Sequence, residues 1–355
     1  MPQGVSGPEG PPYAGSIADA VHLESLLSEP SQRVVETLAR LAGDIIVLGV
    51  GGKMGPTLAR MARRAADMAG GPRRRVIGVS RFTDTAHEAA LHAHEVETIT
   101  CDLLDEAAVG RLPAVPNVVF MAGRKFGSSG NESLTWAMNC LVPAAVCRRF
   151  EASRIVAFST GNVYGLTRVG SGGSRETDVP RPVGEYAMSC LGRERVFEHF
   201  SGARGTRVAI LRLNYAVEMR YGILVDLAQR LLAGVPIDLA MGYVNVIWQA
   251  EANQMALCAL EHAASPPLVV NVAGAEEVSV RGATESLARA LGRPATFAGV
   301  ESPDALLSNG ALAWSLLGAP RVDMARLIDW TADWVGHGRP TFGKPTHFES
   351  RAGDF

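Results

Sequence analysis

The chain has few cysteines, and their spacing does not indicate a disulfide framework or a zinc site. The five cysteines are odd in number and scattered, and none forms a Cys-x-x-Cys pair. A small fold held together by disulfides is therefore not expected, and a reducing, cytoplasmic setting is the simplest prediction. His347 forms no metal-binding pattern with its neighbours, so no metal site is expected.

The sequence also lacks an excess of charge of either sign and lacks long apolar runs. The formal net charge is −2 and the pI is near 6.5, so no overall field favours nucleic acid or an anionic membrane as a partner. No uninterrupted apolar segment approaches the ~20 residues that cross a bilayer. Residues 1–15 are rich in Gly and Pro, unlike the basic and apolar regions of a signal peptide. The remaining composition, 47% hydrophobic and 20% charged, is typical of a globular protein with a full core.

A glycine-rich turn is the strongest motif that is present. Residues 45–48 (IIVL) form a short apolar run typical of a buried parallel strand, and a helical pattern begins near Pro56. Between them, Gly49, Gly52 and Gly55 predict a sharp turn, close approach of a pyrophosphate to the backbone, and close packing of helix on strand. An ordinary strand-turn-helix is the alternative. Residues of this turn that we expect to contact a dinucleotide are Gly49, Gly52, Lys53, Met54 and Gly55.

The length of 355 residues predicts one large α/β domain with a smaller lobe. Residues 1–43 are expected to be a leader and helical extension, and residues 44–214 a Rossmann-like, doubly wound parallel sheet that binds the dinucleotide. Residues 215–335 then form a mixed region with a small substrate lobe and elements that return to the sheet. Residues 336–355 are expected to be a polar tail on the surface.

The second predicted strand, residues 75–81 (RVIGVSR), bears on the choice of cofactor. An acidic residue at its end would bind the ribose hydroxyls of NAD, whereas this strand ends in Ser80 and Arg81. A small hydroxyl and a cation can accommodate the 2′-phosphate of NADP. We therefore favour NADP over NAD, with a solvated surface arginine as the alternative for Arg81.

Further strands place polar and small residues at the same edge of the sheet. Residues 96–100 lead to Asp102 and Leu103, and residues 117–121 lead to Ala122 and Gly123. Because ligands collect at the carboxyl ends of parallel strands, we expect these four residues to contact the cofactor. The basic pair Arg124 and Lys125 follows, beside the expected nicotinamide half. One helix is expected over residues 134–149, and a fifth strand over residues 154–159.

These features, taken in order, resemble a known family. They are the glycine motif, Asp102-Leu103, Met-Ala-Gly at 121–123, Asn139, the run STGNVYG at 159–165, Glu176-Thr-Asp and Tyr186. The order and spacing resemble those of the extended short-chain dehydrogenase/reductases, the NAD-dependent epimerase/dehydratase group, over roughly residues 45–334. The resemblance implies hydride-transfer chemistry, an NAD or NADP cofactor that also contacts Asn139, Tyr186 and Asn214, and a homodimer formed through paired helices.

In that family a Ser or Thr matching Thr160 binds the reacting oxygen, and a Tyr matching Tyr186 exchanges its proton. Both residue types suit the chemistry, since hydride transfer to a carbonyl builds negative charge on oxygen that hydroxyl donors stabilise. Thr160 and Tyr186 are therefore the expected catalytic pair. A threonine that caps a turn and a tyrosine that packs on a helix are the alternatives.

One departure from the family concerns the tyrosine. The family pattern is Tyr-x-x-x-Lys, and here Cys190 occupies the lysine position. Without a nearby cation a tyrosine keeps a pKa of about 10, so its phenolate is scarce at pH 7 and alcohol oxidation is disfavoured. A neutral tyrosine is already the donor that carbonyl reduction needs. Arg124, Lys125 or Arg193 could supply the missing charge, and the sequence does not choose among them.

The region that sets substrate specificity departs from the family as well. The frequent Tyr-Gly-Pro is absent after Arg212, and the frequent His-Val-Asp-Asp is replaced by Trp-Gln-Ala-Glu at 248–251. These changes weaken the case for a nucleotide-diphosphate sugar and favour a smaller polyol or sugar acid. Candidate substrate residues are Arg124, Lys125, Glu218, Arg220, Tyr221 and Trp248, with solvated charges and a core tryptophan as the alternatives.

The leading hypothesis is an NAD(P)-dependent enzyme of the epimerase/dehydratase type that acts on a carbohydrate-like alcohol or carbonyl, a small-molecule substrate. A one-way carbonyl reductase is an alternative that the missing lysine favours. A protein that senses the cofactor without catalysis is another, although retention of Thr160 and Tyr186 speaks against it.

Overall fold

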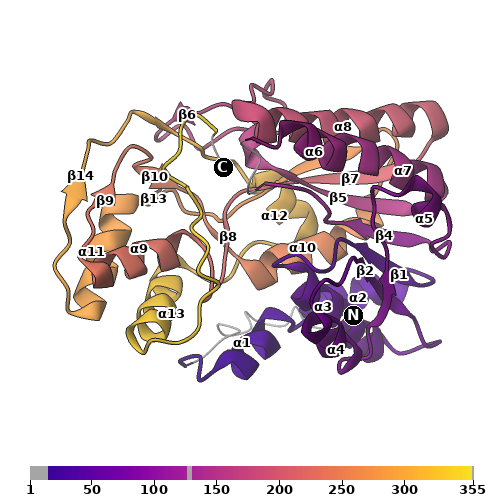
Figure 1. The fold of residues 1–355 in the computed structure, drawn as a ribbon, viewed down its shortest axis with the longest axis horizontal. Helices are drawn as coiled ribbons and strands as arrows, with labels where there is room; N and C mark the ends of the chain where they lie inside the picture. Colours follow the sequence, from indigo (N-terminus) through magenta and orange to yellow (C-terminus); the bar gives the residue numbers. More distant parts are fainter. Residues whose placement is uncertain (1–14, 126–129, 354–355) are drawn as a thin grey trace, which may run out of the picture.

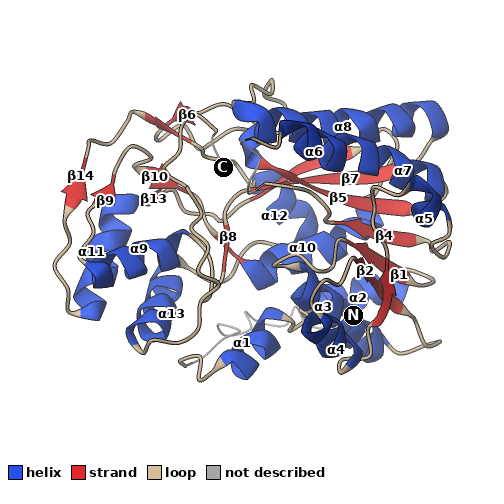
Figure 2. Cartoon of the chain, viewed as in Figure 1, coloured by secondary structure: helices blue, strands red, loops and turns tan. Residues whose placement is uncertain are grey.

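A seven-stranded parallel sheet forms the centre of the larger part of the molecule (Figures 1 and 2). The computed structural model describes residues 15–125 and 130–353. In pairing order the strands are β12 (Leu268–Val272), β7 (Arg207–Leu213), β5 (Arg154–Thr160), β4 (Asn117–Phe120), β1 (Ile45–Leu48), β2 (Val76–Ser80) and β3 (Glu97–Thr100). Ile45 pairs in parallel with Val76 on one side and Asn117 on the other. The predicted doubly wound parallel sheet is confirmed, and its order reverses between β1 and β4, where such sheets bind ligands.

Helices cover both faces of this sheet, because its central strands are apolar on both sides. Ile45 and Val47 belong to one hydrophobic core, and Ile46 and Leu48 to the other. One face carries α5 (Glu106–Gly110), α7 (Val142–Arg149) and α8 (Gly184–Arg204), with α6 (Glu132–Trp136) packed on α8. The other face carries α2 (Gln32–Arg40), α3 (Gly55–Ala69), α10 (Gln249–Ala259) and α12 (Ala311–Leu317), with α1 (Ala20–Leu27) and α4 (Thr85–His92) packed on α3. We call the sheet with these helices the sheet half.

The single helix expected over residues 134–149 is interrupted. Helix α6 passes through a π-helical turn (Ala137–Leu141) into α7. Pro143 explains the interruption, because it has no N–H to donate to the carbonyl of Asn139 four residues earlier. The widened turn carries Asn139, whose side chain is buried.

A smaller lobe lies at the other end of the molecule, on the left in Figures 1 and 2. Its helices α9 (Ile223–Ala233), α11 (Val280–Leu291) and α13 (Met324–Gly336) contact one another. Its short strands are β6 (Thr167–Arg168), β9 (Ile237–Asp238), β10 (Tyr243–Val244), β13 (Val278–Ser279), β14 (Phe297–Ala298) and β15 (Asp304–Ala305), and β8 (Ala216–Val217) pairs with β11 (Ile247–Trp248) between the lobe and the sheet half. We call this part the lobe. The predicted division of the chain into four segments remains a prediction.

The C-terminal segment, residues 337–353, does not return to the sheet. Figure 1 shows it in yellow, running from α13 across the front of the molecule between the lobe and the sheet half. Phe348 and Thr346 are buried, and Arg351 donates to the backbone oxygens of Ala240 and Asp304. The segment is therefore packed along the junction of the two parts. No helix in the described residues has the length and apolar character to cross a bilayer.

Candidate active site

The glycine turn after β1 has the geometry that a dinucleotide needs. Gly49 has φ of +89°, and a Cβ there would lie 2.6 Å from the backbone N of Ala122. A Cβ on Gly55 would run into the backbone of Val50. Gly52 is open, since the atom nearest to a Cβ there would be the Gly49 oxygen at 3.5 Å. One glycine thus makes the turn, one packs helix on strand, and one leaves room for a ligand at the start of α3.

Two adjoining cavities extend from this turn. One of about 260 Å³ lies over the ends of β1, β2 and β3, and one of about 350 Å³ lies between the turn, the end of β5 and the lobe. Both are lined by Gly49, Gly52, Met121 and Gly123. The smaller cavity is also lined by the predicted residues Ser80, Arg81, Asp102, Leu103 and Ala122, and the larger by Lys53, Met54, Gly55, Lys125, Thr160, Tyr186 and Asn214. Because they share these lining residues, the two cavities together reach from the end of β2 to the end of β5, along the strand ends where such sheets bind dinucleotides.

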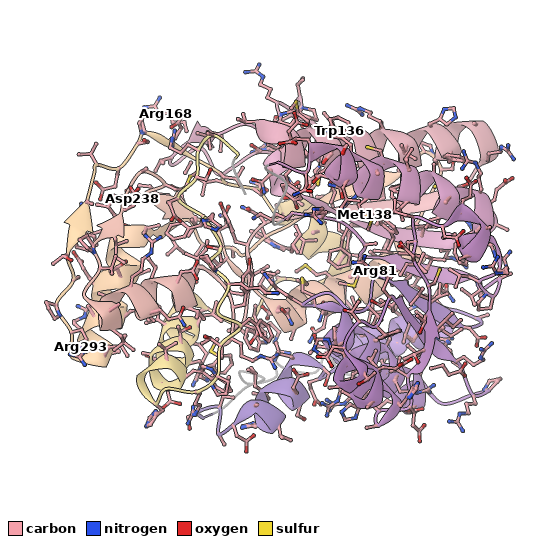
Figure 3. All side chains as sticks on the ribbon, in the orientation of Figure 1. Arg81, Trp136, Met138, Arg168, Asp238 and Arg293 are labelled. Carbon is pink, nitrogen blue, oxygen red and sulfur yellow. The ribbon has the colours of Figure 1, made fainter. Side chains whose placement is uncertain are left out.

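At the smaller cavity, the end of β2 presents Ser80 and an exposed Arg81 (Figure 3). Asp102 also lines this cavity, and its Oδ1 accepts from the backbone N of Leu104 at 3.0 Å. Asp84 is an acidic residue here that we did not predict, and its carboxylate already accepts from the N-terminal backbone of α4 at Ala86. The cavity thus offers one cation and a small hydroxyl at the strand end.

At the larger cavity, Thr160 and Tyr186 share a side-chain hydrogen bond. The Thr160 oxygen accepts from the backbone N and the side-chain amide of Asn162, at 3.2 and 2.9 Å, which leaves its hydroxyl hydrogen to donate elsewhere. Burial, followed by the nearby Cys190, raises the pKa of Tyr186 well above its usual value. The phenol is therefore neutral over the physiological pH range.

Cys190 stands where the family has lysine, and Arg193 reaches the same region from the next turn of α8. Cys190 is fully buried and packs against Tyr186. The Arg193 guanidinium donates to the Phe158 oxygen at 2.7 Å and to the Oδ1 of Asn139. Its charge lowers the pKa of Tyr186, although burial outweighs it.

Of the other two cations that the sequence left open, Lys125 lies close to the tyrosine. Its Nζ is 5.7 Å from the centroid of the Tyr186 ring, and burial lowers the pKa of Lys125 to about 8. Arg124 is not among the described residues that line either cavity. Of these three cations, Arg193 lowers the pKa of Tyr186 through its charge, and Lys125 lies near the ring.

Several predicted residues lie elsewhere. The amide of Asn139 donates to Ser189 at 2.8 Å and joins α8 to the loop after β4, behind Gly123 and outside both cavity linings. Glu218 is buried in an ion pair with Arg220, which also pairs with Glu24. Trp248 is fully buried against Trp330, with ring centroids 5.4 Å apart. We assign no substrate contact to Arg124, Glu218, Arg220 or Trp248, because the structure does not bring them to the larger cavity.

Tyr221, a candidate from the sequence, lines the larger cavity, and residues that were not predicted complete it. Tyr215 and Tyr221 enter from the loops around β8, and Gln249 enters from the start of α10. Thr346 comes from the C-terminal segment, where it donates from its hydroxyl and its backbone N to Asp226, at 2.6 and 2.8 Å. No sequence signal marks Thr346, since its neighbours are those of a surface loop.

Among the described residues, no group of three or more His, Cys, Asp or Glu side chains is arranged to hold a metal ion. A comparison with curated proteins finds no match. Residues 45–217 match the model of the NAD dependent epimerase/dehydratase family.

Solved structures share the fold at low sequence identity. The UDP-glucuronic acid 4-epimerase from Bacillus cereus, solved with UDP-glucuronic acid and NAD, is 18% identical, with a TM-score of 0.68 over 83% of this chain and 99% of that chain. The UDP-glucose 4-epimerase from Thermotoga maritima, solved with UDP-glucose, is 16% identical, with a TM-score of 0.69 over 83% and 99%. MoeE5 in complex with UDP-glucuronic acid and NAD is 21% identical, with a TM-score of 0.67 over 83% and 100%. Residues 45–217 of the chain are thus similar to the NAD dependent epimerase/dehydratase family, and the fold is the one that these solved structures share.

Proposed function

We propose that the protein is an NAD(P)-dependent oxidoreductase of the epimerase/dehydratase type, which transfers a hydride to or from a carbohydrate alcohol or carbonyl. The observation that carries this proposal is the hydrogen-bonded pair of Thr160 and Tyr186, on the wall of a cavity that continues to the glycine turn. The UDP-sugars and NAD named for the similar structures are consistent with it.

The glycine turn and its two cavities fit a nicotinamide dinucleotide. Gly49, Gly52, Gly55 and the start of α3 would hold the pyrophosphate, because Gly52 leaves its side of the turn open. Asp102 and Leu103 would contact the adenine, with Ala122, Gly123 and Asn214 further along the same space. When bound, the cofactor would supply or accept the hydride.

Thr160 and Tyr186 are proposed to act on the reacting oxygen. The Thr160 hydroxyl, oriented by its two bonds from Asn162, donates to that oxygen as negative charge develops. Tyr186, held neutral by burial, gives its proton to the oxygen when a carbonyl is reduced. Proton transfer leaves Tyr186 as a phenolate. Arg193 and Lys125 lower the free energy of this charged form, since both bring positive charge to the tyrosine.

One-way carbonyl reduction is the second candidate, and the raised pKa of Tyr186 favours it. An alcohol substrate needs the phenolate as base, and Cys190 replaces the lysine that would stabilise this form. Reversible chemistry, as in an epimerase, needs both protonation states. Equal rates of oxidation and reduction at pH 7 would therefore exclude the one-way assignment.

For the cofactor we propose a preference for NADP, which rests on Arg81 and Ser80 at the end of β2. The Arg81→Ala variant should bind NADP ~10-fold more weakly and NAD as the parent does, because a charged hydrogen bond to phosphate is lost. Isothermal titration with both nucleotides measures this. Tighter binding of NAD by the parent, unchanged in the variant, would reject the preference.

The function is tested by incubating the protein with each nucleotide and a panel of aldoses, uronates and nucleotide sugars. Turnover is followed by nicotinamide absorbance and by chromatography of the sugar products. Thr160→Val should retain nucleotide binding and lose ~100-fold in turnover, because one oxyanion donor is removed. A protein that binds neither nucleotide would contradict the proposal.

A further inference from the structure

The chain uses lysine at three positions, although lysine and arginine together number 34. The three are Lys53 in the glycine turn, Lys125 after β4 and Lys344 in the C-terminal segment. Lys53 and Lys125 line the larger cavity, and Lys344 lies two residues before Thr346, which lines it as well. Segments far apart in the chain therefore bring every lysine to one place, while the rest of the molecule carries arginine.

The charges of Lys344 and Lys125 act on Lys53 across this space. Burial, and then the charges of Lys344 and Lys125, lower the pKa of Lys53 to about 7. Mutual repulsion of this kind costs free energy in the empty cavity, and an anion bound between the lysines would relieve it.

Two carboxyls of the described residues act on Lys53, and each of them also bonds elsewhere. Glu218 is paired with Arg220, and Asp226 accepts two hydrogen bonds from Thr346. Burial raises the pKa of each of these carboxyls, which disfavours their ionised forms. Both carboxyls nevertheless lie close enough to Lys53 to raise its pKa, which offsets part of the effect of the two other lysines.

The position of Lys53 directs its charge away from the glycine turn. Its Nζ lies 3.1 Å from the centroid of the Tyr221 ring, and Tyr221 belongs to the loop after β8, on the lobe side of the cavity. A cation–π contact of this kind holds the ammonium across the cavity from β1. A ligand group that contacts all three lysines would thus lie toward the lobe and the C-terminal segment.

We propose that Lys53, Lys125 and Lys344 form the binding site for a carboxylate or phosphate group on the substrate. The inference rests on the proposed function, because it names the class of carbohydrate that the same cavity accepts: an anionic sugar, such as a sugar acid or sugar phosphate. Lysine suits this task, since its ammonium is a compact charge on a flexible stem that can follow a tetrahedral or a planar anion. A cavity of about 350 Å³ has room for a single sugar ring beside the nicotinamide.

The test compares ligands that differ in charge. D-glucuronate, D-glucose 6-phosphate and neutral D-glucose are titrated by calorimetry into protein saturated with its nucleotide. The charged sugars should bind at least ~10-fold more tightly than glucose, because each lysine adds a charged hydrogen bond. Lys344→Met and Lys125→Met should each remove most of this difference, and Lys344→Arg should keep it.

Two controls separate the lysine site from general effects of charge and fold. Arg293→Met removes an exposed cation at the far end of the lobe (Figure 3) and should change no affinity. Nucleotide affinity, measured on each variant, should stay within about twofold of the parent. A variant that fails to fold is revealed by its circular dichroism, and the exposed Lys344 remains testable if Lys125→Met does not fold.

Three results would overturn the proposal. They are equal affinity for charged and neutral sugars, failure of both charged sugars and of inorganic phosphate to bind, and an equal loss of nucleotide and sugar affinity in the lysine variants. The last result would assign the lysines to the cofactor pyrophosphate. If the protein binds no nucleotide, the proposed function fails; inorganic phosphate that still binds, and is lost in Lys344→Met, would support the anion site by itself.

Discussion

The sheet half and the lobe are built in different ways. In the sheet half, the turn that faces the ligand is fixed by backbone geometry, as Gly49 shows by its contact with Ala122 at the end of the neighbouring β4. In the lobe, paired strands of two residues, such as β10 with β13, connect the helices. Side chains from separate loops and from the C-terminal segment, such as Tyr221 and Thr346, form the lobe side of the cavity.

Because of this difference, the sheet half and the lobe are suited to different roles in binding and catalysis. A group that packed backbone holds in place keeps the same position whichever substrate is bound. The cofactor and the proton donor need such a fixed position. A surface made of loop side chains can change one residue at a time, which suits the choice of substrate. Changes in the sheet half should therefore affect turnover or folding, and changes in the lobe should affect affinity for substrate.

The sharpest test of this comparison is Tyr186→Phe. Removal of the phenolic hydroxyl should lower turnover by ~10²–10⁴-fold, because a general acid is lost, while nucleotide affinity changes little. Steady-state kinetics and nucleotide titration measure the two effects. If the variant turns over the substrate as fast as the parent, the proton comes from another group, and Glu185 and Lys125 would be examined first.

A pair of glycine variants tests the backbone argument. Gly49 and Gly234 both have positive φ, +89° and +66°, but a Cβ on Gly49 would meet Ala122, whereas nothing lies within 4 Å of one on Gly234. Gly234→Ala should cost ~1–2 kcal/mol of unfolding free energy for its conformation. Gly49→Ala should cost more, ~3 kcal/mol or above, because two strand ends must also separate. Urea denaturation followed by circular dichroism gives both values, and equal losses would argue against this reading of the turn.

Thr346→Val tests the contribution of the C-terminal segment. The variant loses the 2.6 Å hydrogen bond to Asp226 and keeps the shape of the side chain. We expect a loss of ~1–2 kcal/mol in unfolding free energy, together with a several-fold rise in KM. Turnover at saturating substrate should stay near that of the parent. A fall in turnover with unchanged KM would place Thr346 with the chemistry of the sheet half.

The smallest expected effect concerns Glu251, which joins the two parts. This buried carboxylate on α10 accepts from the backbone N of Val322, just before α13, at 3.0 Å. Burial raises the pKa of Glu251 to about 7, above the ~4.3 of an unfolded chain. Its stabilising contribution is therefore full below pH 4.3 and is lost as the pH rises through about 7.

Glu251→Gln removes this titration and keeps an acceptor for Val322. The unfolding free energy of the variant minus that of the parent should be larger at pH 8 than at pH 5, by ~1 kcal/mol or more. Urea denaturation at the two pH values measures the change. A relative stability that does not vary with pH would show that Glu251 is ionised throughout.

Much of the sheet half could be predicted from the sequence, because its signals are local. Apolar runs such as 45–48 mark strands that are buried on both faces, and the glycine spacing marks the turn that follows. The π-helical turn around Asn139 was not expected, although Pro143 gave a reason for it. Trp248 could be assigned to a pocket or to the core from its type alone, and it lies in the core.

The lobe side of the site could not be predicted in the same way. Tyr215 and Thr346 are brought to one cavity by contacts between distant segments, which leave no periodic pattern in the sequence. Arg193 was one of three cations considered for the tyrosine, and its contacts with Phe158 and Asn139 depend on how α8 packs on the sheet. Predictions of this kind need the three-dimensional arrangement.

The gathering of all lysines at one cavity has a practical consequence for chemical labelling. An amine-reactive reagent can acylate this chain at its N-terminal amine and at Lys53, Lys125 and Lys344. The pKa of Lys53 is lowered to about 7, so its amine is deprotonated near neutral pH to a greater extent than that of an ordinary lysine, and it should react first among the three lysines. Mass spectrometry of the acylated peptides would thus report occupancy of the cavity directly, with no probe introduced by mutation.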